Sequence, residues 1–340
     1  MHRDMNRRDV LKAAGFAAAG LAFSPLGFAQ DPPAGERKKV LFFTKSQGFQ
    51  HSAITRPKND PTKLAFAEQL LTDLGAKHGF EVTCSKDGTI FSPENIAKFD
   101  VFAFYTTMDL TKDSDKYDTM KGPDGKNVPD PSKLLHKEPG MPPGAKEAFL
   151  DAIKGGKGFI GFHSATDTFH SGVKDKTNML RNVDEQGRDA FDPYIQMIGG
   201  EFIVHGKQQK ATLKAIDKKF PGAAALDNQS FVEEWYSLKN FAPDLHVILA
   251  EDNTGMEGDM YQRPPFPQTW ARMHGKGRVF YTSMGHREDV WEKPEFQALV
   301  VGALKWSSRQ IDADVTPNIS QATPGADVKK DQLPATQAAR

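Results

Sequence analysis

Short, uninterrupted apolar runs alternate with helical stretches through the first half of this 340-residue chain. Three of these apolar runs are too short to form helices: residues 40–44, 101–105 and 158–162. A strand formed by any of them would be apolar on both faces. Residues 62–77 and 143–154 repeat apolar side chains at helical spacing and end at glycines. This alternation predicts an α/β fold in which a parallel sheet is covered by helices on both faces.

The second half of the chain has a different pattern. Strand candidates follow one another without helices of comparable length, at residues 211–216, 231–238, 245–250, 268–273 and 278–283. The last two flank His274-Gly275-Lys276-Gly277, a sequence typical of a hairpin turn. Residues 294–308 then have helical spacing, which predicts a final helix.

The N-terminus resembles a twin-arginine export signal. Arg7 and Arg8 precede Val10-Leu11-Lys12, and an Ala/Gly-rich stretch follows that is too short and too weakly apolar to span a bilayer by itself. Gly27-Phe28-Ala29 places small residues around a plausible cleavage point. We expect residues 1–30 to be a signal peptide, and the protein to be periplasmic or exported without a membrane anchor.

One domain, residues 38–312, is the simplest division of the remaining chain. The composition beyond it is rich in Ala, Pro, Asp, Lys and Gln, which predicts a disordered tail over residues 313–340. Two long loops, 108–142 and 169–193, interrupt the regular elements. Loops of this length in a compact domain tend to be lids or binding surfaces.

Composition excludes two classes of function. The formal net charge at pH 7 is zero, so the chain lacks the strongly basic character on which nucleic-acid binding depends. Cys84 is the single cysteine, which excludes an internal disulfide framework and a cysteine-rich metal knuckle. We therefore expect a small-molecule partner and no nucleic acid.

Four of the ten histidines lie in or just after the ends of predicted strands: His51, His163, His205 and His286. Ligands of open parallel sheets bind beyond the carboxyl ends of the strands. Imidazole can act there as an acid, a base or a metal ligand near neutral pH. Any one of these residues alone would be read as a hydrogen-bonded loop histidine, but four in equivalent positions predict a shared site.

Glu234 and Tyr236 add a carboxylate and a phenol on a later strand, where alternation points both side chains to one face. We expect His163, His286, Glu234 and Tyr236 to be catalytic. His51, His163 and His205, with Glu234, are the candidate ligands of one divalent metal, and this donor set suits zinc, manganese or iron. The alternative interpretation is that Glu233 and Glu234 have no role in a site and lie at a solvent-exposed edge of a strand.

Five segments, in this order, resemble the ThuA-like (trehalose utilisation) family: residues 48–51 (Gly-Phe-Gln-His), 158–165, 199–205 (Gly-Gly-Glu-Phe-Ile-Val-His), 234–236 and 275–286. The resemblance extends from about residue 39 to residue 306. It implies a class I glutamine amidotransferase-like fold, in which a flavodoxin-like parallel sheet flanked by helices carries an antiparallel extension. It also implies a link to disaccharide or keto-sugar metabolism.

The nucleophile of glutamine amidotransferases is missing. Their cysteine lies on the sharp turn after a central strand, which corresponds here to residues 161–164, Gly-Phe-His-Ser. Cys84 lies on a different strand and reads as an inert core residue. Ser164 is a weak alternative nucleophile, because its surroundings match the Gly-x-Ser-x-Gly pattern only loosely.

Two functions remain open. The first is an enzyme that acts on a disaccharide or keto-glycoside, in which a histidine or carboxylate removes a proton beside a ring carbonyl. Gln47, Ser164, Trp235 and Arg287 are its expected substrate-binding residues. The second is a non-catalytic sugar-binding or scaffold domain that retains the fold without the cysteine nucleophile.

Overall fold

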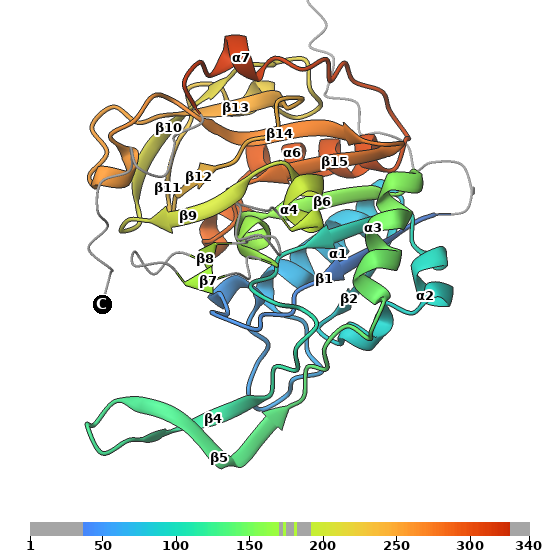
Figure 1. The fold of residues 1–340 in the computed structure, drawn as a ribbon, viewed down its shortest axis with the longest axis vertical. Helices are drawn as coiled ribbons and strands as arrows, with labels where there is room; N and C mark the ends of the chain where they lie inside the picture. Colours follow the sequence, from blue (N-terminus) through green and yellow to red (C-terminus); the bar gives the residue numbers. More distant parts are fainter. Residues whose placement is uncertain (1–36, 170–172, 175–179, 182–191, 327–340) are drawn as a thin grey trace, which may run out of the picture.

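A nine-stranded sheet forms the centre of the molecule, with strand order β11-β10-β13-β14-β15-β6-β3-β1-β2 (Figure 1). The computed structural model describes residues 37–169, 173–174, 180–181 and 192–326, so the expected signal peptide and most of the expected 169–193 loop lie outside the described residues. The strands of this sheet are β1 (Lys38–Phe43), β2 (Phe80–Ser85), β3 (Val101–Phe104), β6 (Gly158–Phe162), β10 (Gln209–Ala215), β11 (Ser230–Glu233), β13 (His246–Asp252), β14 (Pro267–His274) and β15 (Gly277–Thr282).

Half of this sheet is parallel and half is antiparallel. β2, β1, β3, β6 and β15 are joined by parallel pairings, in the order characteristic of flavodoxin-like folds. β14, β13, β10 and β11 continue the sheet through antiparallel pairings. The expected parallel sheet with an antiparallel extension is therefore confirmed.

Two hydrophobic clusters cover the two faces of the sheet. One contains side chains of α1 (Phe66–His78), α5 (Glu288–Trp291) and α6 (Pro294–Ser307), and the other contains those of α2 (Pro93–Lys98), α3 (Ala145–Gly155) and α4 (Pro193–Ile198). β1 contributes to both, because Val40 and Phe42 point into the first cluster while Leu41 and Phe43 point into the second. Its uninterrupted apolar run is thus explained by burial on both faces.

The strand expected over residues 231–238 is interrupted. β11 ends at Glu233, and the chain crosses to a separate two-stranded ladder formed by β12 (Tyr236–Lys239) and β9 (Glu201–His205). His205 is paired with Tyr236 in this ladder. Glu234 lies in the break between the two strands, where its side chain is not constrained by the alternation of either one.

The expected 108–142 loop contains a hairpin. β4 (Lys116–Lys121) and β5 (Asn127–His136) pair antiparallel and project from the body of the molecule (Figure 1). The remaining short elements are β7 (Val173–Lys174), β8 (Leu180–Arg181), α7 (Ile319–Ala322), and the 3-10 turns η1 (Ser52–Ile54), η2 (Gly88–Ile90), η3 (His163–Asp167), η4 (Ala224–Leu226) and η5 (Asp259–Tyr261).

The expected domain end at residue 312 is too early. Asn318 Oδ1 accepts a hydrogen bond from the backbone N–H of Val247 at 2.7 Å, and the backbone N–H of Asn318 donates to the carbonyl of Leu245 at 3.0 Å. Ala326 is buried. Residues 316–319 therefore pack along β13 despite their polar surroundings, whereas residues 327–340 lie outside the described part of the chain. Within the described residues, every helix is too short or too polar to cross a bilayer.

Candidate active site

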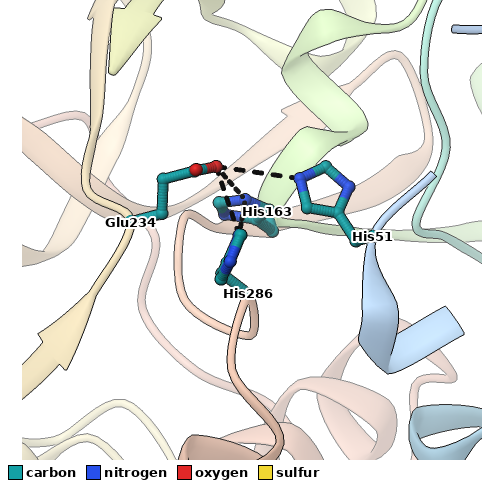
Figure 2. A group of neighbouring side chains, drawn as sticks. All are labelled: His51, His163, Glu234 and His286. Carbon is teal, nitrogen blue, oxygen red and sulfur yellow. Dashed lines mark hydrogen bonds and ion pairs between the residues drawn. The ribbon is translucent and has the colours of Figure 1, made fainter. Parts of the chain in front are cut away.

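His51, His163, Glu234 and His286 meet at the carboxyl edge of the parallel strands (Figure 2). His51 follows β1 and precedes η1, His163 directly follows β6, and His286 follows β15. Glu234 reaches the group from the break between β11 and β12. One donor atom from each residue lies within 4.8 Å of the donor atoms of all the others. Segments far apart in the sequence thus supply one compact cluster.

His163 has an unusual backbone conformation. Its φ angle is +43°, a left-handed value that costs a non-glycine residue about 1–3 kcal/mol. The fully buried ring is held by its Nδ1 atom, 2.8 Å from the backbone carbonyl oxygen of Ser283. A carbonyl oxygen only accepts, so Nδ1 carries the proton, and Nε2 of the neutral ring presents its lone pair to the cluster. The Tyr281 hydroxyl donates to the His163 carbonyl at 2.7 Å and also fixes this turn.

The Glu234 carboxylate lies at the centre of the cluster. Its Oε2 atom is 3.2 Å from Nδ1 of His286, 3.3 Å from Nε2 of His163 and 3.7 Å from Nε2 of His51. Its Oε1 atom is 3.3 Å from Nδ1 of His205. Burial opposes ionisation of Glu234, but the facing imidazoles outweigh it and hold the pKa of this carboxyl well below its ordinary value. The cluster therefore contains a carboxylate anion at neutral pH.

The three clustered histidines have different proton affinities. Burial lowers the pKa of His163 to about 3, and burial also lowers the pKa of His51. Burial opposes protonation of His286 as well, but the Glu234 carboxylate outweighs it and raises the pKa of His286. His51 and His163 are thus neutral near pH 7, the form in which imidazole binds metal ions.

The donor spacing fits a tetrahedral metal ion. Four donors about 2.0–2.1 Å from one ion are roughly 3.3–3.4 Å apart. His163 Nε2, His286 Nδ1 and Glu234 Oε2 are separated from one another by 3.2–3.3 Å. His51 Nε2 completes the set at 3.7 Å from Glu234. The cluster could therefore hold zinc, manganese or iron once His51 moves to the spacing of the other three donors.

His205 does not belong to the donor group, so the expected ligand set of His51, His163 and His205 needs correction. The four grouped donors include His286 instead of His205, and His205 faces the other oxygen of Glu234, with Nδ1 3.3 Å from Oε1. His205 Nδ1 also lies 3.0 Å from the carbonyl oxygen of Gly206. Its side chain is 38% exposed, unlike the buried ring of His163.

Glu233 supports the cluster from behind, a role that sequence reasoning missed. Its Oε1 atom accepts hydrogen bonds from the backbone N–H groups of Gly285 (2.7 Å) and His286 (3.0 Å), and its Oε2 atom accepts one from Glu234 (3.0 Å). Burial raises its pKa to about 7, although these amides favour the carboxylate. The solvated-edge alternative is thus wrong for Glu233, which is completely buried.

Tyr105 is a second residue that sequence reasoning missed. It follows β3, and its ring centroid lies 5.4 Å from that of His51 and 5.8 Å from that of His163. Its buried hydroxyl has no hydrogen-bond partner among the described residues. Tyr105 lies at the end of a strand, as the clustered histidines do, and this position could have placed it in the site from the sequence alone.

Tyr236 packs against the cluster. Its ring centroid lies 4.1 Å from that of His163, and its ring stacks on His205 at 5.8 Å. Burial raises the pKa of its hydroxyl well above the ordinary value. The tyrosine therefore keeps its proton at neutral pH and acts here by fixing the two imidazole rings.

Two expected substrate-binding residues are inaccessible. Trp235 is completely buried in the core, and its indole N–H donates to the carbonyl of Gln209 at 3.0 Å, so neither ring face is open to a sugar. Ser164 is also completely buried, which argues against both substrate contact and a nucleophilic role. Both expectations are corrected here.

The other two expected substrate-binding residues are at the surface. Gln47 is exposed, and its backbone N–H donates to the carbonyl of Thr107. Arg287 Nη1 donates to Oε1 of Gln208 at 2.8 Å, and Nε2 of Gln208 lies 2.9 Å from Nε2 of His286. Arg287 therefore helps to orient the His286 ring indirectly, by holding the side chain of Gln208.

Cys84 has the inert character expected from the sequence. Its thiol lies against α1, 3.7 Å from the carbonyl oxygen of Glu68. Burial raises the pKa of this thiol to about 12. A thiol with that pKa is not a nucleophile at neutral pH.

Comparison with known proteins gives a family match. A family model described as ThuA, trehalose utilisation, matches residues 136–307. The crystal structure of a putative ThuA-like protein from Bacteroides uniformis aligns with a TM-score of 0.53 and 17% sequence identity, over 83% of this chain and 95% of that chain. A putative ThuA-like protein from Parabacteroides merdae aligns with a TM-score of 0.49 and 14% identity, over 83% of this chain and 94% of that one. The first structural likeness supports the fold alone. No curated protein matches this chain.

Proposed function

The chain belongs to the ThuA (trehalose utilisation) family, and from that premise we propose that it is a metal-assisted enzyme acting on a disaccharide or keto-glycoside. One observation supports this proposal above the others. Nitrogen atoms of His51, His163 and His286 all lie within 3.7 Å of a single carboxylate oxygen, Oε2 of Glu234. The Nε2 atom of His163 carries a lone pair and lies 3.3 Å from Oε2 of the ionised Glu234. Two electron-rich atoms this close in a buried site need a positive group beside them, either a proton on Nδ1 of His286 or a metal ion held by the whole cluster.

His51, His163, His286 and Glu234 would hold the metal ion. When bound, a divalent ion would polarise a substrate carbonyl and stabilise negative charge on its oxygen. A ring carbonyl already acidifies the neighbouring C–H bonds, so removal of one proton can start elimination, isomerisation or hydrolysis.

His205 is the residue best placed to move that proton. Its Nδ1 atom faces the carbonyl oxygen of Gly206 and Oε1 of Glu234, two acceptors that fix the proton on this nitrogen. With the proton on Nδ1, Nε2 is the nitrogen that can accept a proton as a base. The partly exposed side chain allows contact with a substrate, which the buried His163 does not.

We also propose that residues 1–30 direct export by the twin-arginine route. The support is the sequence Arg7-Arg8 followed by a weakly apolar stretch and small residues. This route carries folded proteins and would deliver the chain with its metal already bound.

The test is turnover of oxidised (keto) disaccharides by the purified protein, with unoxidised disaccharides as controls. We expect turnover of the oxidised forms, its loss with a chelator, and its return when zinc or manganese is added. His205→Gln should lower kcat by about a hundredfold or more while the bound metal is unchanged, because a general base contributes about 10²–10⁴ to the rate.

His274→Gln is the matched control, because His274 ends β14 beside the β14–β15 turn, at the opposite edge of the parallel strands from the cluster. It should leave both kcat and metal content unchanged. Saccharide binding without turnover would contradict the proposal and favour a non-catalytic sugar-binding domain.

A further inference from the structure

Phe49 is exposed beside the cluster. It lies in the segment between β1 and η1, and 71% of its surface is accessible. Its ring centroid is 5.0 Å from that of His51, with the two ring planes nearly perpendicular at 85°. A single exposed apolar side chain is common on protein surfaces, so the case for a function depends on its surroundings.

The backbone under this ring is firmly anchored. The Thr107 hydroxyl donates to the carbonyl oxygen of Phe49 at 3.1 Å and accepts from the backbone N–H of Gly48 at 3.3 Å. A Cβ atom at position 48 would lie 2.6 Å from Cγ of Met108, so the segment packs closely against the residues that follow β3. Phe49 therefore presents its ring from an ordered support, and a ligand would not have to order that backbone on binding.

An open cavity of about 630 Å³ begins at this ring. Its walls include the polar side chains of Gln50, Ser52 and Lys58, and it extends to His286 of the cluster. The size falls within the roughly 300–1,000 Å³ typical of small-molecule sites. His286 thus belongs both to the lining of the cavity and to the cluster.

The charged residues of this cavity are already paired. Arg56 is bound by the buried Glu68, with Nε 2.8 Å from Oε2 and Nη2 3.2 Å from Oε1. Lys58 Nζ lies 2.9 Å from Oδ1 of Asp118 in β4. With both cations compensated, the cavity suits a neutral, hydroxyl-rich ligand better than an anion such as a phosphate.

We propose that Phe49 forms the floor of a subsite for a neutral sugar ring, namely the second ring of a disaccharide whose first ring lies at the histidine cluster. A pyranose ring has an apolar C–H face that packs on an aromatic ring, while its hydroxyl groups hydrogen-bond to polar walls. This inference depends on the proposed function only for the identity of the reacting ring. Phe49 thereby takes the substrate-binding role that the sequence suggested for Trp235.

Calorimetric titration with trehalose, maltose, cellobiose and methyl glucoside tests the subsite without requiring turnover. We expect the wild-type protein to bind at least one of the disaccharides about tenfold more tightly than methyl glucoside. Phe49→Ala should remove that advantage, and Phe49→Trp should retain it, because indole offers a larger stacking face. Metal content and methyl glucoside affinity should be the same in all three proteins.

Phe66→Ala is the matched control, since Phe66 is also partly exposed but lies at the start of α1 and outside this cavity. Equal disaccharide affinity in Phe49→Ala and wild type would overturn the subsite, as would wild-type protein that shows no preference for disaccharides. If Phe49→Ala loses disaccharide binding while no keto-disaccharide is turned over, the enzymatic proposal fails and the subsite stands.

Discussion

Replacing Glu234 by glutamine should lower the metal affinity of the protein by about a hundredfold or more. The substitution keeps the size of the side chain but removes the only carboxylate among the four clustered donors. The change leaves three neutral imidazole ligands, and the charge that balances a divalent ion is lost. Competition with a chromophoric chelator measures the affinity directly.

Glu257→Gln serves as the control for this variant, because Glu257 is an exposed carboxylate paired with Lys207 at the surface. It should bind metal like the wild type. In the absence of metal, Glu234→Gln should unfold close to the temperature of the metal-free wild type, which separates loss of the ion from loss of the fold. Wild-type metal affinity in Glu234→Gln would contradict the assignment of the cluster.

Replacing Glu233 by alanine should damage both the fold and the site. Three backbone N–H groups, those of Glu234, Gly285 and His286, would lose their acceptor in a buried environment. At about 1–3 kcal/mol for each stranded group, we expect a loss of roughly 3 kcal/mol or more in the free energy of unfolding. The segment that carries His286 would also lose its support, so metal affinity should fall by about 10–100-fold.

Glu233→Gln separates these two effects. Its carbonyl oxygen can still accept from Gly285 and His286, but its NH₂ group cannot accept from Glu234, so it should be intermediate in stability and retain most metal affinity. Urea denaturation and chelator competition measure the two quantities, with the exposed Glu292→Ala as a control. A Glu233→Ala protein as stable as wild type would show that water replaces the carboxylate.

The architecture could be predicted because burial leaves a direct mark on the sequence. The apolar run at the end of β1 has no polar alternation, since Leu41 and Phe42 enter different cores on opposite faces of the sheet. The carboxyl ends of parallel strands share one edge, so histidines just beyond those ends had to be near one another. His51, His163 and His286 follow this rule.

Residues outside the parallel strands could not be placed in this way. The positions of His205 and Glu234 depend on the break between β11 and β12 and on the pairing of β12 with β9, which are long-range contacts. Trp235 was assigned to substrate by residue type, but it lies in the break and is turned into the core. Phe49 is an aromatic residue in a polar loop, two residues before a histidine at a strand end. That position was a better indication of substrate contact than the residue type of Trp235.

The hairpin in the long loop also had a local signal. Gly122-Pro123-Asp124-Gly125 contains the residues that favour a tight turn, and Gly125 has a φ angle of +78°. The flanking strands are mostly polar and exposed, so hydrophobic alternation did not reveal them. A pattern based on burial cannot identify strands that project into solvent.

Anomalous diffraction from crystals of the zinc-loaded protein would test the metal assignment most directly. The expected result is one strong peak about 2.0–2.2 Å from Nε2 of His51, Nε2 of His163, Nδ1 of His286 and a carboxylate oxygen of Glu234. A zinc-loaded crystal with no peak between these four side chains, or with its strongest peak at another position, would contradict it.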